Sequence, residues 1–421
     1  MSAQPGRGRP RLLMFSEAVT LAHIARPYAL GSELAYSGFD VHLARDPRYD
    51  DLLGDELSQR HDIASITPEA FTAALAAGSP LYELETLKAY VEEDLRVIAH
   101  VKPDAIIGDF RLSLAVSAAM AGLPYLALAN AYWSPFCHQR HPVPELPFVR
   151  VLGPAMGQWL FSAVRPLAFA LHCIPMHRLR RHYGLPSLGA DLGRVYTYAD
   201  YTLYADAPGL FDMRELPQSH RFIGPVTWSP EVAVPDWWAD AENDKPCIYV
   251  TLGSSGRADL LPTVIDALGG LAATAIVSTA GASLPQALPQ NVFAAAYLPG
   301  DAAVARADLV LCNGGSPTSQ QALSQGVPVL GIAGNLDQYL NMSAVERFGA
   351  GRLLRSGTLT AHALTGAVRE MLADSAPAAA ANRLASSWRA YDPAAACAEV
   401  LQEALGCPPI PHAVSDAEVY R

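Results

Sequence analysis

The chain has 421 residues, of which 51% are hydrophobic, and a formal net charge of −11 with a sequence pI of about 5.5. This length exceeds what one compact core usually holds and predicts two domains. The acidic balance argues against a nucleic-acid partner, which requires a basic face.

Cysteine usage and the N-terminal region indicate a cytoplasmic protein. The six cysteines have no paired spacing, which is typical of reduced, incidental cysteine and not of a disulfide framework or a zinc site. The first apolar stretch, "LLMFSEAVTLAH" at 12–23, is too short and too polar for the core of a signal peptide. We therefore expect a cytoplasmic location.

Short apolar runs alternate with helix-like segments along the whole chain. Strands are predicted at "RLLMFS", "DVHLAR", "AIIGDF", "YLALAN", "YTLYA" and "RFIG" in the first half, and at "CIYVTLG", "TAIVSTA", "NVFAAAYL", "DLVLCN", "PVLGIA" and "GRLLR" in the second. Helices are predicted between them at 26–37, 81–101, 112–121, 259–271 and 318–325. This alternation predicts parallel sheets covered by helices on both faces.

The apolar segment at 155–174, "AMGQWLFSAVRPLAFALHCI", is the part of the chain most similar to a membrane span. Arg165 and Pro166 stand in its middle, where a spanning helix tolerates them poorly. The sequence therefore favours a buried or half-buried helix that kinks at Pro166, over contact with a membrane.

A change in composition separates the two halves. The stretch at 224–246 is rich in Pro, Trp and acidic residues and has no helical or strand period. We therefore predict a first Rossmann-like domain at 1–225, a linker at 226–246, a second Rossmann-like domain at 247–390, and a C-terminal helix and tail at 391–421.

The stretch "LVLCNGGSPTSQQAL" at 309–323 predicts a strand, a Gly-rich turn and a helix. Ser316 is a good N-cap residue, and Pro317 suits the first helical position. In an open α/β sheet, ligands bind beyond the carboxyl ends of the strands, and a helix N-terminus there suits an anion such as a diphosphate. The turn alone is equally compatible with an ordinary strand–helix connection.

Other strand ends supply groups that suit a nucleotide sugar. Ser254 follows the strand "CIYVTLG", and the aromatic residue Tyr297 follows another strand. Asp337 and Gln338 come just after the strand that follows the Gly-rich turn, where an acid and an amide suit sugar hydroxyls. Because the carboxyl ends of parallel strands share one edge, these groups are expected to form one site.

The region from about 247 to 351 resembles the donor half of the UDP-glycosyltransferase family, which includes plant natural-product and bacterial macrolide glycosyltransferases. The resemblance is carried by "YLPGDAAVARADLVLCNGGSPTSQQALSQGVPVLGIAGNLDQYLN" and its spacing. It implies a GT-B architecture, with two Rossmann-like domains facing across a cleft and a C-terminal helix that packs back on the N-terminal domain.

The resemblance also implies roles for individual residues. Tyr297 would stack on the pyrimidine, and Gln321 would bind the ribose. The diphosphate would contact Ser254, Gly315, Ser316 and Thr318, with Asn313 at the position of the usual histidine; the sugar would contact Asp337 and Gln338. Asn313, Pro317 and Gln321 depart from the family pattern. Gln321 in place of a glutamate indicates a deoxyribose donor such as a dTDP-sugar, while the three departures together are also compatible with impaired donor binding.

The first half is expected to supply the catalytic base. His23 follows the first strand in a predicted loop, and Asp109 ends another strand of the same sheet. A histidine is the natural base for a hydroxyl near neutral pH, and a carboxylate that orients it improves it. The resemblance implies this pair as the catalytic dyad; taken singly, His23 could be a surface residue and Asp109 a helix N-cap.

The predicted reaction is inverting transfer of a sugar from a UDP- or dTDP-sugar to a hydroxyl of a hydrophobic small-molecule acceptor. The chain has no Asp-x-Asp pair, so neither a metal nor another cofactor is expected. Two alternatives remain: a non-catalytic or donor-impaired relative that binds a nucleotide sugar or small ligand, and a nucleotide-sugar 2-epimerase, for which no convincing set of acid–base carboxylates stands out.

Overall fold

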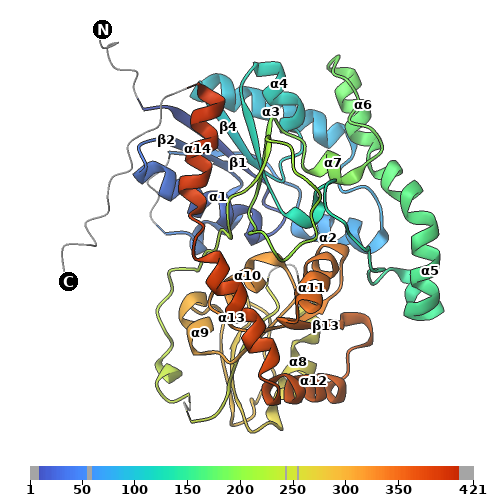
Figure 1. Ribbon diagram of the computed structural model, residues 1–421, viewed down its shortest axis with the longest axis vertical. Helices are drawn as coiled ribbons and strands as arrows, with labels where there is room; N and C mark the ends of the chain where they lie inside the picture. The colour runs from blue at the N-terminus through green and yellow to red at the C-terminus, as the bar shows by residue number, and fades with distance from the viewer. Residues whose placement is uncertain (1–8, 55–58, 242–243, 254–255, 407–421) are drawn as a thin grey trace.

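The computed structural model of the chain describes residues 9–54, 59–241, 244–253 and 256–406, and it contains two parallel β-sheets (Figure 1). The first sheet has the strand order β3-β2-β1-β4-β5-β6-β7 and the second has the order β10-β9-β8-β11-β12-β13. The strand order reverses between β1 and β4 in the first sheet and between β8 and β11 in the second. Such reversals leave a crevice where ligands of doubly wound folds bind.

The strands follow the predicted runs closely. Their bounds are β1 Arg11–Ser16, β2 Asp40–Arg45, β3 Gln59–Asp62, β4 Ala105–Asp109, β5 Tyr125–Ala129, β6 Tyr201–Tyr204, β7 His220–Phe222, β8 Cys247–Thr251, β9 Thr274–Ser278, β10 Val292–Ala295, β11 Leu309–Cys312, β12 Val329–Ala333 and β13 Gly351–Arg355. Only β3 was not expected. It is a polar edge strand, "QRHD", and such strands lack the apolar run that predicts a buried one.

Helices cover both sheets. They are α1 Leu21–Tyr36, α2 Pro68–Ala77, α3 Leu84–Val101, α4 Leu114–Ala121, α5 Pro147–His172, α6 Ile174–His182, α7 Leu192–Tyr196, α8 Leu261–Gly269, α9 Gly300–Arg306, α10 Ser316–Ser324, α11 Leu336–Phe348, α12 Ala361–Ala373, α13 Ala376–Trp388 and α14 Pro393–Leu405. Between β7 and β8 the described residues form one short 3₁₀ helix, Asp236–Trp238. This arrangement confirms the two Rossmann-like units of a GT-B fold.

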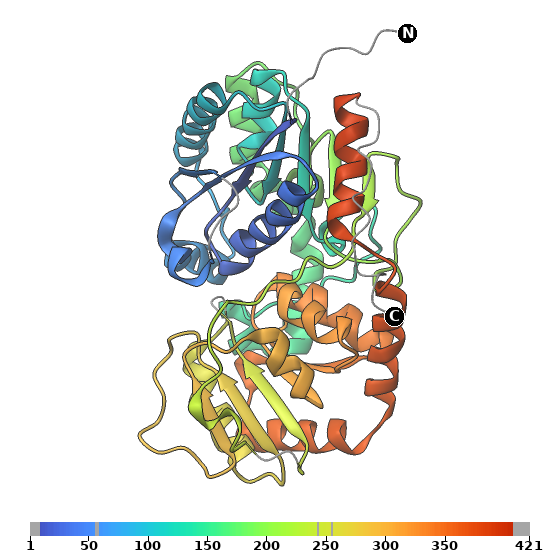
Figure 2. The ribbon, with the colours of Figure 1, turned by 90° about the vertical axis from the view of Figure 1, so that its left-hand side faces the viewer.

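The last helix, α14, returns to the first domain. Figure 2 shows it lying along the domain that contains the N-terminal sheet. Its buried residues Cys397, Val400 and Leu401 share a core with Leu30 and Leu34 of α1. The expected packing of the C-terminal helix on the N-terminal domain is therefore confirmed.

Helix α5 differs from its prediction. Figure 1 shows α5 along one edge of the molecule. The expectation of a buried or half-buried helix is wrong, because Trp159 is 69% exposed and Leu167 is 66% exposed. The break in the helix lies at Gly153, where φ is 74° and ψ is 165°, and not at Pro166. Glycine alone adopts this backbone conformation without strain, so the break falls there.

Candidate functional site

His23 lies in the first turn of α1, beside the carboxyl end of β4. The expectation of a loop at this position is wrong, because α1 begins at Leu21. Pro27 stands inside the helix, where it removes the N–H group that would bond to the His23 carbonyl. The imidazole Nδ1 lies 2.7 Å from Asp109 Oδ1, and 20% of the histidine side chain is exposed. The structure therefore brings the two expected residues together and leaves the imidazole accessible.

Arg26 holds the buried Asp109 carboxylate in place. Its Nε donates to Asp109 Oδ2 and its Nη2 donates to Oδ1, both at 2.9 Å, while Nη1 donates to Asn130 Oδ1 at 2.8 Å. Burial disfavours the cation, but the adjacent carboxylate more than compensates and raises the pKa of Arg26. Sequence reasoning missed Arg26, although its spacing of three residues from His23 places both on one helix face.

The two residues after this aspartate support the imidazole. Phe110 has a left-handed backbone, with φ 58°, which is uncommon for a residue that carries a side chain. Its ring stacks on His23 with 4.9 Å between ring centroids. Arg111 is fully buried and donates to the carboxylates of Glu17 and Asp94, which come from the loop after β1 and from α3. This buried ion cluster fixes the loop that presents the dyad.

The Gly-rich corner between β11 and α10 is stabilised by a hydrogen bond to its own Asn313. The N-cap of α10 is Gly315, one residue earlier than the predicted cap at Ser316. Asn313 Oδ1 accepts the Gly315 N–H at 2.9 Å, and Asn341 Nδ2 of α11 donates to the Gly314 carbonyl at 2.9 Å. The corner is therefore preformed, and one of its amide donors is already occupied by Asn313.

A path of hydrogen bonds joins this corner to the dyad. Ser316 Oγ donates at 3.3 Å to Asn130 Oδ1, the same oxygen that accepts from Arg26. Arg26 in turn contacts both members of the dyad, with Nη2 lying 3.2 Å from His23 Nδ1. The predicted phosphate-binding turn and the predicted base are thus connected through two polar side chains, Asn130 and Arg26.

Asp206 is a buried acid at the junction of the two domains. Its carboxylate accepts the Ala131 N–H at 2.6 Å and also accepts the side-chain amide of Gln320, which belongs to α10. Burial raises the pKa of Asp206 to about 6, while these hydrogen bonds and Arg26 act in the opposite direction. A group that titrates close to neutral pH therefore lies where the domains meet.

Asp337 and Gln338 begin α11, as the strand end predicts. Asp337 Oδ1 accepts from Trp133 Nε1–H at 2.7 Å, which is a contact between the domains. Gln338 forms a capping box with Asn335, and its Oε1 accepts the Gly334 N–H at 2.8 Å. The Gln338 oxygen therefore has a structural role; the predicted contact of this residue with the sugar stays a prediction.

The remaining predicted donor residues that the structure describes lie on or near β10 and α10 of the second domain. Gln321 Nε2 donates to Asp301 Oδ1 at 2.8 Å, so its amide faces the start of α9. Tyr297 follows β10 and is half-buried, as is Thr318 in the first turn of α10. Ser254 lies outside the described residues.

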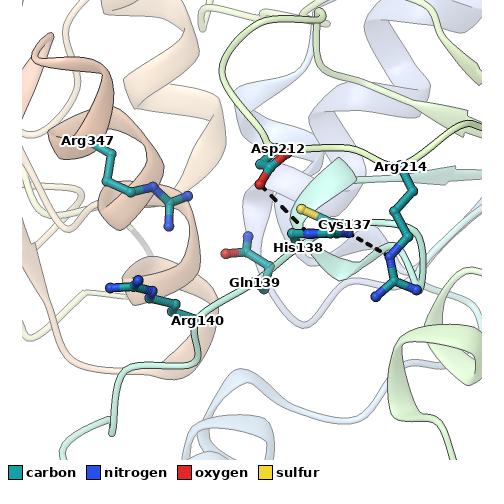
Figure 3. A pocket seen from close by; sticks show the side chains of 7 residues that line it. All are labelled: Cys137, His138, Gln139, Arg140, Asp212, Arg214 and Arg347. Carbon is teal, nitrogen blue, oxygen red and sulfur yellow. Dashed lines mark hydrogen bonds and ion pairs between the residues drawn. The ribbon is translucent and has the colours of Figure 1, made fainter.

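A separate basic groove of about 650 Å³ lies beside the later part of α11. Figure 3 shows Arg347 of α11 opposite Arg140, and Cys137, His138, Gln139, Asp212 and Arg214 complete the lining. None of the predicted site residues lines this groove. Among the residues that the structure describes, no group of three or more His, Cys, Asp or Glu side chains could hold a metal ion.

Known proteins share both the sequence and the fold. Residues 262–405 match the erythromycin biosynthesis protein CIII-like C-terminal domain. The chain is 49% identical, over 92% of its length and 86% of the relative, to a PGL/p-HBAD biosynthesis rhamnosyltransferase from Mycobacterium bovis (strain BCG / Pasteur 1173P2). An inactive PGL/p-HBAD biosynthesis glycosyltransferase from the same strain is 46% identical over 63% of the chain and 73% of that relative. The solved structure of the spinosyn rhamnosyltransferase SpnG superposes with a TM-score of 0.67 at 21% identity, over 94% of this chain and 100% of that one.

Proposed function

The chain belongs to the family of the PGL/p-HBAD biosynthesis glycosyltransferases, and we propose that it catalyses an inverting, metal-independent reaction. It is a hexosyltransferase of GT-B fold. In the proposed reaction, a sugar moves from a nucleotide diphosphate sugar to a hydroxyl group of a hydrophobic acceptor. The observation that carries this proposal is the accessible His23 imidazole, 2.7 Å from the buried Asp109 carboxylate.

The proposed mechanism starts with His23. Asp109 accepts a hydrogen bond from Nδ1–H and thereby selects the tautomer in which Nε2 is the free base. Nε2 removes the acceptor proton as the acceptor oxygen attacks the anomeric carbon from the face opposite the diphosphate, which gives inversion. Asp109 then stabilises the imidazolium, and the N-terminus of α10 stabilises the departing diphosphate.

For the donor, we propose a dTDP-linked deoxyhexose such as rhamnose. The relative with 49% identity is named a rhamnosyltransferase. Gln321 offers a neutral amide where the resemblance expects a glutamate on the ribose hydroxyls, which suits a sugar ring that has lost its 2′-hydroxyl. For the acceptor, the name of that relative supports a hydroxyl compound of PGL/p-HBAD biosynthesis.

One other function has support. The protein could bind a nucleotide sugar or small ligand without turning it over. Two observations favour this function: the Gly315 N–H, a donor of the predicted phosphate turn, is already bonded to Asn313, and one of the similar proteins is named inactive. The 2-epimerase alternative has no such support.

Measurements of nucleotide binding and of sugar transfer distinguish the active glycosyltransferase from the donor-impaired alternative. The protein is titrated with dTDP, UDP, GDP and ADP while its melting temperature is followed, because a ligand at 100 times its Kd stabilises by about 2.7 kcal/mol. Release of dTDP from dTDP-rhamnose is then measured with a panel of phenols and alcohols. We expect stabilisation by dTDP and acceptor-dependent release; stabilisation without release would support the donor-impaired alternative, and no response to any nucleotide would overturn both.

A further inference from the structure

The outer face of α5 carries most of the large hydrophobic side chains that the described residues expose. The described residues expose twelve large hydrophobic side chains, and seven of them lie on α5: Val151, Leu152, Met156, Trp159, Val164, Leu167 and Leu171. The helical stretch Pro147–His182 is long and apolar enough to cross a membrane by length and composition, and 17% of its most apolar window is buried. Most of this window is therefore not buried against the described chain.

The exposed face of α5 is apolar, whereas the exposed face of an ordinary surface helix is polar. Met156, Trp159, Leu167 and Leu171 recur at intervals that place them on one helical face, and that face is exposed. Gln158 lies on the opposite side, where it accepts the Val143 N–H at 2.7 Å and donates to the His141 carbonyl. A helix that exposes a row of large apolar side chains is suited to an apolar environment.

The charged residues around α5 indicate which apolar environment its exposed face would contact. Between Glu145 and Asp191 the chain has no acidic residue and five arginines, although the whole protein carries a net charge of −11. Arg150 precedes the exposed apolar residues and Arg178 and Arg181 follow them, and all three are exposed. Cations at both ends of an apolar face complement the anionic headgroups and acyl chains of a bilayer surface.

The attachment of α5 to the protein indicates that it lies in the surface of the bilayer and does not cross it. Val149 and Phe161 are buried in a cluster with Leu336, the first residue of α11. Cys173, Met176 and Leu179 at the following turns are buried in a core of the N-terminal domain. A helix anchored to the folded domains at both ends keeps only one face free, which fits an interfacial position.

We propose that the exposed face of α5 docks on the surface of an anionic lipid bilayer. Because the cluster that contains Phe161 also packs against Leu336, the neighbour of Asp337, docking holds the predicted donor residues close to the bilayer, where a hydrophobic acceptor would be concentrated. The docking itself does not depend on the proposed transfer reaction, so it is tested without substrate.

The test is co-sedimentation of the full chain with vesicles of phosphatidylcholine, with and without about 30 mol% phosphatidylglycerol, an anionic content that attracts basic segments. We expect binding to the anionic vesicles that weakens as salt is raised. The double variant Trp159→Glu/Leu167→Glu should lower binding by about tenfold or more, because both side chains would bring charge into the acyl region.

The matched control places the same charges elsewhere. Tyr36→Glu/Met120→Glu replaces two exposed apolar residues of α1 and α4, which are 75% and 49% exposed, and should bind as the wild type does. Circular dichroism and melting temperature confirm that each variant folds. Equal loss in both double variants, or no binding by the wild type, would overturn the proposal. A wild-type dimer that the α5 variant converts to monomer would assign the face to a second copy of the chain instead.

Discussion

At the scale of single residues, His23 is the side chain on which the proposed reaction depends most. His23→Ala should lower kcat by about 10²–10⁴-fold, because it removes the general base and leaves the donor turn intact. The melting-temperature response to dTDP should persist. The exposed histidine His362 of α12 supplies the control, since His362→Ala should leave kcat unchanged. Unaltered turnover of the His23 variant with an accepted acceptor would remove His23 from the mechanism.

Phe110 combines an unfavourable backbone conformation with contact to the imidazole. Both Phe110→Ala and Phe110→Gly delete the ring that stacks on His23, so both should lower kcat to a similar extent. They should differ in stability, because only glycine adopts φ 58° without cost; Phe110→Gly should have a free energy of unfolding higher by about 1 kcal/mol than Phe110→Ala. Urea denaturation measures the difference. The reverse order would show that the backbone at this position is not strained.

The residues of the site could be predicted one at a time but not as a network. His23 and Asp109 followed from strand ends that share an edge, and the structure places them together. Arg26 and Asn130 were missed because neither residue type is distinctive of a catalytic site, and the bonds from Asn130 to Arg26 and to Ser316 of the second domain appear only in three dimensions. Asn313 was identified as a departure, but its bond to Gly315 could be found only in three dimensions.

At the scale of elements, strands were easier to predict than helices. Strands such as β1 and β12 are buried on both faces, so an apolar run marks nearly their whole length. Helix starts were less certain: α1 begins five residues before the expected Arg26, because Pro27 is accommodated inside the helix. Helix α5 was predicted to be buried or half-buried because hydrophobicity alone cannot show which side of a helix faces the protein.

Helix α14 belongs to the C-terminal part of the sequence but to the core of the N-terminal domain, so its packing can be tested there. Leu401 is fully buried in that core, and Leu401→Ala should destabilise the N-terminal domain by about 2–5 kcal/mol through the cavity that it leaves. Glu399→Ala changes an exposed residue of the same helix and should have little effect. Calorimetry resolves the outcome; equal melting curves for both variants would contradict this packing.

At the scale of the whole molecule, Asp206 makes the stability of the domain junction depend on pH. Its pKa in the folded protein, about 6, lies above the ordinary value of 3.8. The folded state therefore binds more protons than the unfolded state between these values, so the contribution of this group to stability falls as pH rises from about 4 to about 6. The difference corresponds to about 3 kcal/mol, as an order of magnitude.

Asp206→Asn tests this directly. The variant loses a hydrogen-bond acceptor and should be less stable than the wild type at pH 4, and the gap should narrow as pH rises to 7, because the cost of ionising the buried acid is absent. Denaturation in urea at pH 4 to 7 measures the gap. Asp200→Asn, which changes an exposed carboxylate that also accepts a backbone N–H, is the control. A gap that stays constant for Asp206→Asn would show that this acid does not titrate in the range.

The position of α14 has a consequence for movement between the domains. The chain crosses from the first domain to the second at 223–246 and crosses back between α13 and α14. Any change in the angle between the domains must bend both crossings together. The domains can therefore rotate about the line that joins the two crossings, whereas twisting of one domain against the other is opposed. The same double crossing means that cutting the chain once, at 223–246, would leave a C-terminal fragment whose last helix still fills the core of the other fragment.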